Sequence, residues 1–128
     1  MIGQWDPSQT ASVNTPDSDF LLQLADLSAA PEHSDEITRQ RAAQYIKTPE
    51  NDWQEAFGKM NNEALIQLAF FYVRAEVTLS GFEAGAKNPA IWVFRYLRNS
   101  GRKPAKDIVK ALKAETDNRF IPYGNALL

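Results

Sequence analysis

The chain of 128 residues contains no cysteine and a single histidine, and these shortages exclude several kinds of site. Without cysteine there is no disulfide framework, no thiolate nucleophile and no zinc site with cysteine ligands. His33 has no second imidazole with which to share a metal, so we expect it to cap a turn or face solvent. A serine nucleophile would need a base within reach, and no signature for one is present. The sequence therefore predicts no catalytic residue, no metal site and no cofactor, and an enzyme is the least supported class.

Long apolar runs are also missing. The longest, residues 69–73 and 90–94, fall far short of the roughly 20 residues that a membrane span needs. The first residues lack the basic and apolar regions of a signal peptide. Neither G-x-G-x-x-G nor G-x-x-x-x-G-K-[ST] occurs, so no glycine loop is expected to hold a phosphate. We therefore expect a soluble, cytoplasmic protein without membrane contact.

What the chain does contain is one long apolar segment, residues 61–80, that suits a central helix. On a wheel of roughly 100° per residue, its apolar side chains form two neighbouring stripes that cover most of the circumference. The first stripe contains Leu65, Leu68, Tyr72, Ala75 and Leu79, and the second contains Ile66, Phe70, Val73 and Val77. Such a helix needs other helices over two of its faces. We expect Asn61 or Asn62 to cap its start and Gly81 to end it.

Start signals predict further helices on both sides of this segment. Each signal is a capping residue or a proline that suits the first turn of a helix, and they occur at Thr15-Pro16, Ser34, Thr48-Pro49, Asn88-Pro89 and Pro104. The helix after Ser34 has a thin apolar stripe that includes Ile37, which indicates a peripheral element. Trp53, Phe57 and Met60 make a bulky face on the next helix, which favours a core position over a binding groove.

These signals predict an all-α fold. We expect a compact bundle of five to six helices around a central helix at about residues 62–79. A C-terminal helical hairpin and an extended, packed tail complete the bundle. Residues 1–14, which include Trp5, are expected to form a mobile N-terminal arm, and residues 15–128 a single helical domain.

Glu76 breaks the pattern of the central segment, because it falls among its apolar positions. An unpaired buried carboxylate is costly, so Glu76 should have a partner. One interpretation is a structural ion pair or hydrogen bond to Arg95, Arg119 or a tryptophan indole. The other is that Glu76 lines a polar pocket as a ligand anchor or general base. Glu76, Arg95 and Arg119 are therefore the candidate buried polar or pocket residues.

Charge is distributed unevenly along the chain. Residues 1–85 contain 5 Lys or Arg and 13 Asp or Glu, whereas residues 86–128 contain 9 and 3. Three interpretations remain open: the two parts lie against each other, the basic part binds an acidic protein, or it binds nucleic acid. The candidate interaction surface lies on the basic hairpin 88–116 and the apolar tail, at Arg98, Arg102, Lys103, Lys106, Lys110, Lys113, Phe120 and Tyr123.

Residues 81–124 also resemble a group of known sequences. An aromatic helix with Trp92, a basic hairpin and the ending Thr116-Asp117-Asn118-Arg119-Phe120, followed by Pro122 and Gly124, are similar to small uncharacterised α-helical proteins of proteobacteria. No activity is known for that group, so the resemblance implies a small bacterial helical protein and no function. Taken alone, Asp117-Asn118-Arg119 indicates a helix exit whose side chains bond to free carbonyls and neighbouring loops.

A non-enzymatic interaction or regulatory protein that acts through its surface fits these observations best, with a protein partner or a second copy of the chain. Nucleic-acid binding by residues 88–116 is the alternative, although the acidic first part and the net charge of −2 oppose contact with a polyanion. A small-ligand pocket or enzyme centred on Glu76 is the third hypothesis.

Overall fold

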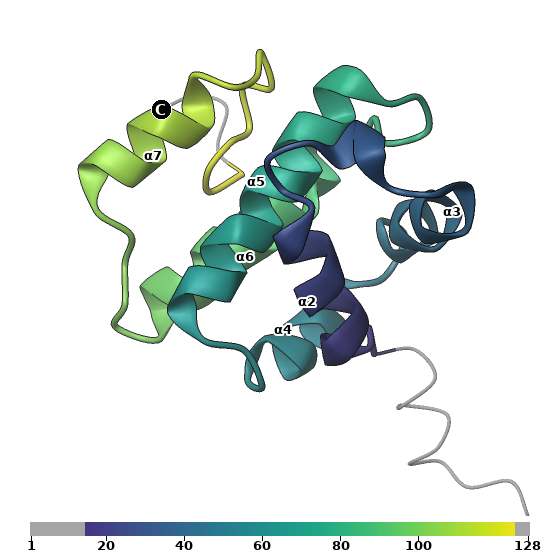
Figure 1. The fold of residues 1–128 in the computed structure, drawn as a ribbon. Coiled ribbons are helices and arrows are strands. Elements are labelled where there is room, and N and C mark those ends of the chain that lie inside the picture. Colours follow the sequence, from purple (N-terminus) through teal and green to yellow (C-terminus); the bar gives the residue numbers. More distant parts are fainter. Residues whose placement is uncertain (1–14, 125–128) are drawn as a thin grey trace, which may run out of the picture.

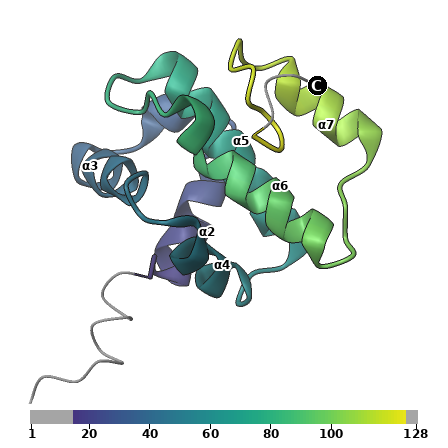
Figure 2. The same ribbon diagram turned by 180° about the vertical axis from the view of Figure 1, so that it is seen from behind.

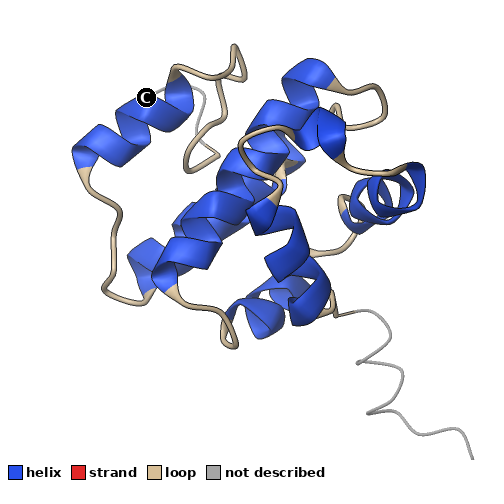
Figure 3. Ribbon diagram, in the orientation of Figure 1, coloured by secondary structure: helices blue, strands red, loops and turns tan. Residues whose placement is uncertain are grey.

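The computed structural model describes residues 15–124, and this part of the chain contains helices and loops but no strand (Figures 1 and 3). The predicted all-α bundle is confirmed. The arm predicted for residues 1–14 lies outside the described residues, as do Leu127 and Leu128 of the tail. The described elements are α2 (Ser18–Asp26), the 3₁₀ turn η2 (Pro31–His33), α3 (Glu36–Tyr45), α4 (Glu50–Phe57), α5 (Asn62–Thr78), the 3₁₀ turn η3 (Gly85–Lys87), α6 (Pro89–Asn99) and α7 (Lys106–Lys113).

Helix α5 runs through the middle of the bundle. Helix α2 packs on one side of it and α6 on the opposite side, as the two views from front and back show (Figures 1 and 2). Leu65, Leu68, Ala69 and Phe71 of α5 are completely buried. A central helix covered on two faces was predicted, and the structure confirms it.

One apolar side chain that was predicted to pack is exposed instead. Val77, in the last turn of α5, is 58% exposed because it borders an open hollow that the C-terminal tail does not fill. Its predicted burial was wrong, since a helical wheel does not show where neighbouring elements end. Ile37 is 79% exposed, which agrees with the peripheral position predicted for its helix, where Ala42 is the buried residue.

Carboxylates and amides cap α2, α3, α5 and α6, whereas α4 and α7 follow Pro49 and Ala105 without a side-chain cap. Asp17 rather than Thr15 caps α2, and Asp35 rather than Ser34 caps α3, where its Oδ1 accepts from the Thr38 N–H at 2.7 Å. That hydrogen bond lowers the pKa of Asp35, because a charged acceptor makes the stronger bond. Asn61 and Asn88 cap α5 and α6 as expected, and the four polar side chains set where their helices begin.

An aromatic cluster joins α3, α4 and α5. The rings of Trp53 and Tyr72 meet edge to face at 5.7 Å, and Phe57 lies beside Trp53 at 5.8 Å. Tyr72 is fully buried, and its hydroxyl donates to the Ala42 carbonyl at 2.8 Å. Burial raises the pKa of Tyr72 well above its ordinary value. The bulky face of α4 is therefore core, as the sequence predicted.

The C-terminal tail lies between α7 and the pair α5–α6 in both views (Figures 1 and 2). Ile121 is buried, and Tyr123 packs its ring against Phe94 at 6.2 Å. Arg95 of α6 donates through Nε to the Tyr123 carbonyl at 2.9 Å. The tail is thus packed on its own bundle as far as residue 124, and it separates α7 from the other helices.

Candidate functional site

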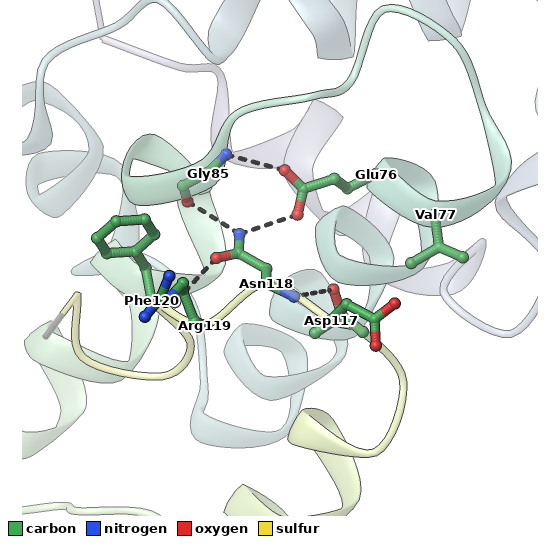
Figure 4. A pocket seen from close by; sticks show the side chains of 8 residues that line it. Glu76, Val77, Gly85, Asp117, Asn118, Arg119 and Phe120 are labelled. Carbon is green, nitrogen blue, oxygen red and sulfur yellow. Dashed lines mark hydrogen bonds between the residues drawn. The ribbon is translucent and has the colours of Figure 1, made fainter. Parts of the chain in front are cut away.

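Glu76, in the last turn of α5, accepts four hydrogen bonds. Its Oε2 accepts from the backbone N–H groups of Ala84 and Gly85 at 2.7 and 2.9 Å. Its Oε1 accepts from the side-chain amides of Asn118 at 2.9 Å and Asn88 at 3.3 Å. Figure 4 shows the carboxylate facing Gly85 on one side and Asn118 on the other.

Asn118 extends this network into the tail. Its Nδ2 also donates to the Gly85 carbonyl at 2.9 Å, and its Oδ1 accepts from the Phe120 N–H at 2.9 Å (Figure 4). Asn88 donates to the Tyr72 carbonyl at 3.3 Å while it caps α6. The end of α5, the loop after it, the start of α6 and the tail are therefore tied together at one point. The expected bonding of the helix exit to a neighbouring loop is confirmed for Asn118.

The partners of Glu76 differ from the predicted ones. Arg95 forms an ion pair with Glu50 at 3.1 Å instead, and the exposed Arg119 makes no hydrogen bond to Glu76. The reason is that residues 81–87 fold back over the end of α5 and bring two backbone N–H groups to the carboxylate. A helical wheel carries no sign of that loop path. The amide side chain of Asn88 was an available signal, because it is a donor that directly follows the loop in sequence. Asn118 gave no such signal, because only the fold brings the tail to Glu76.

An open hollow of about 450 Å³ lies beside this network, and its wall includes Glu76, Val77, Gly85 and residues 116–120 (Figure 4). A carboxylate offers about four acceptor positions, and four donors already face Glu76. A ligand or a proton would have to displace one of them. The arrangement therefore supports the structural interpretation of Glu76 over a role as general base.

A second feature is the basic surface, which comprises the exposed side chains of Arg98, Arg102, Lys103, Lys106, Lys110 and Lys113. None of these six forms an ion pair with any residue that the structure describes. In residues 15–124, Arg95–Glu50 alone pairs a cation of the basic part with a carboxylate of the acidic part. The expected contact between the two parts therefore does not neutralise this surface.

Tyrosine rings support part of the basic surface. The Arg98 guanidinium lies 4.7 Å and the Lys103 ammonium 6.0 Å from the centre of the Tyr123 ring. Arg102 lies 5.5 Å from the Tyr96 ring and donates to Asn62 Oδ1 at 2.6 Å. Burial raises the pKa of Tyr123, against the opposing effect of Arg98. These contacts hold the cations in place without cancelling their charge.

Phe120 and Tyr123 were predicted to belong to the interaction surface. Both are half-buried, and their rings pack against the core. Tyr123 therefore lies under the basic surface, where it carries Arg98 and Lys103, rather than projecting from it.

No family model, curated protein or solved structure matches this chain. The resemblance of residues 81–124 to proteobacterial proteins therefore stays a prediction. Within residues 15–124 no group of three His, Asp or Glu side chains could hold a metal ion, and no helix is long and apolar enough to cross a membrane.

Proposed function

We propose that this chain is a helical adaptor or regulatory protein that binds an acidic protein partner on its basic surface. One observation carries the proposal: six exposed cations gather at the end of α6 and along α7, and none is paired within the described residues. A charged surface that folding leaves unneutralised attracts a partner of opposite charge and speeds the encounter.

Its composition supports a protein partner. Arginine held against tyrosine is typical of the residues that contribute most to protein interfaces, and Arg98 on Tyr123 and Arg102 on Tyr96 provide two such pairs. A nucleic acid is less suitable, because exposed acids such as Asp26, Glu32 and Glu36 would repel a long polyanion. An acidic patch on a protein is local and avoids that repulsion.

The test is affinity purification of the full chain from its source cells, followed by quantitative mass spectrometry. The variant Lys106→Glu, Lys110→Glu, Lys113→Glu reverses the α7 part of the basic surface. A matched control, Lys47→Glu, Lys59→Glu, Lys87→Glu, makes the same change in net charge at exposed lysines elsewhere. We expect the recovery of an acidic partner to fall about tenfold or more with the α7 variant, which corresponds to a loss of about 1.4 kcal/mol of binding free energy. The control should recover the partner as the wild type does.

Equal recovery of the same proteins with both variants would count against the proposal. Recovery that disappears on nuclease treatment, together with gel retardation of DNA or RNA at low salt, would instead support the nucleic-acid hypothesis. Sedimentation of the purified chain shows whether it self-associates, and so distinguishes binding of a second copy from binding of a different protein.

A further inference from the structure

We infer that a second hollow, walled by Trp92, is a binding site for a small planar aromatic anion, such as an aromatic carboxylate or sulfonate. We call it the Trp92 pocket. It lies where the α3–α4 loop meets η3 and the start of α6, and none of its lining residues belongs to the basic surface. Ala84 on its wall donates its backbone N–H to Glu76, whereas the Glu76 side chain itself does not line the pocket. Its volume of about 520 Å³ suits a small molecule.

The walls of the Trp92 pocket are largely apolar. Ile46 and Pro49 from the α3–α4 loop, Ala84 and the Trp92 indole provide most of the lining. Trp92 is held by Arg95, whose guanidinium lies 5.4 Å from the centre of the indole ring. A flat aromatic body can stack on such a wall and gain the contact energy of an aromatic pair.

The charged side chains around the Trp92 pocket leave an excess of positive charge. Glu50 borders the pocket, but its carboxylate is paired with Arg95 at 3.1 Å. Lys47 and Lys87 also border the pocket, are exposed and form no ion pair in the described part of the chain. Two ammonium groups therefore remain for a ligand, and a ligand with one anionic group would satisfy them.

The hollow beside Glu76 carries no comparable signal. Its carboxylate is fully bonded, and Asp117 and Arg119 place opposite charges on its wall. The Trp92 pocket has both an aromatic wall and unpaired charge of one sign, and this combination specifies a class of ligand.

The probe for the experiment is 8-anilinonaphthalene-1-sulfonate, which carries a sulfonate on a planar naphthalene ring, titrated into the full chain. Its neutral counterpart, N-phenyl-1-naphthylamine, keeps the aromatic body and lacks the anion. We expect saturable binding of the sulfonate, with NMR shift changes concentrated at Lys47, Ala84, Lys87 and the Trp92 indole N–H. The neutral counterpart should bind about tenfold or more weakly.

The variant Lys47→Glu, Lys87→Glu should weaken sulfonate binding by about tenfold or more, while the matched control Lys106→Glu, Lys113→Glu leaves it unchanged. Circular dichroism spectra of both variants that match the wild-type spectrum show that the variants are folded. Shift changes scattered over the surface, equal affinity for the two probes, or equal affinity of the two variants would each overturn the inference. The basic surface takes no part in the Trp92 pocket. A negative result for ligand binding in this pocket would therefore leave the proposed function intact.

Discussion

Glu76 shows how a single carboxylate can join segments of a fold that lie far apart in the sequence. It lies at the end of the central helix, and four N–H donors from three other segments meet on it. A hydrogen bond to a charged group contributes about 1.5–3 kcal/mol, roughly twice the neutral value. The position that interrupts the apolar pattern of α5 is therefore the one that attaches the loop and the tail to it.

Replacing Glu76 by Gln tests that role. An amide has one acceptor oxygen, so its NH₂ group would face donors from Ala84 and Gly85 or from the two asparagines. We expect urea unfolding to show a loss of about 1–3 kcal/mol. Glu63→Gln, at an exposed position in the first turn of α5, is the control and should change stability by less than about 1 kcal/mol. A Glu76 variant as stable as the control would show that the network contributes little.

Gly124 is a second residue whose identity is constrained. Its φ is +86°, and a Cβ there would overlap the Arg95 guanidinium, which is held by Glu50 and the Tyr123 carbonyl. Gly101 has a similar φ of +75° with open space around it. Both substitutions to Ala cost about 1–2 kcal/mol of backbone strain, and Gly124→Ala should cost more because it also displaces Arg95. Equal losses in thermal unfolding would mean that Arg95 moves aside freely.

The helices α5 and α7 differ most in how firmly they are packed into the bundle. Helix α5 has eight buried residues and neighbours on two sides, whereas Leu112 is the buried residue of α7. A helix as short as α7 is marginal in water without packing. Its attachment depends on Leu112, on the partly buried Ile108 and Val109, and on the tail that lies between α7 and the other helices.

Hydrogen exchange should show this difference directly. We expect the amides of α7 to exchange much faster than those of α5 and α6, because local opening of α7 exposes less apolar surface than opening of either of those helices. Leu112→Ala should remove the remaining protection of α7 and leave that of α5 unchanged. Protection of α7 equal to that of α5 would contradict the account of a weakly attached helix.

The sequence predicted those elements whose signals are local. The apolar stripes of α5, the caps Asn61 and Asn88 and the core face of α4 all depend on residues within a few positions of one another. It did not predict the partners of Glu76 or the exposure of Val77, because both depend on how the loop after α5 and the distant tail return to that helix. The exposed cations of α7 were evident from spacing, but only the fold shows that they have no ion-pair partner among residues 15–124.

At the scale of the whole molecule, the uneven charge of the chain is preserved in three dimensions. In the described part of the chain, Arg41 and Asp17 form an ion pair within the acidic part, and the two pairs that cross to the C-terminal part use Arg95 and Glu115. Lys106, Lys110 and Lys113 remain exposed on α7, which lies on the other side of α5 from α3 (Figures 1 and 2). We propose that folding leaves these cations for an external partner to bind.

The free energy of unfolding of the variant Lys106→Gln, Lys110→Gln, Lys113→Gln, measured at low and high salt, tests this claim most directly. Because exposed, unpaired lysines contribute little to stability, we predict a value within about 1 kcal/mol of the wild type at both salt concentrations. A loss of about 3 kcal/mol or more at low salt that disappears at high salt would show that the lysines are engaged with the acidic part of their own chain, and would contradict the claim.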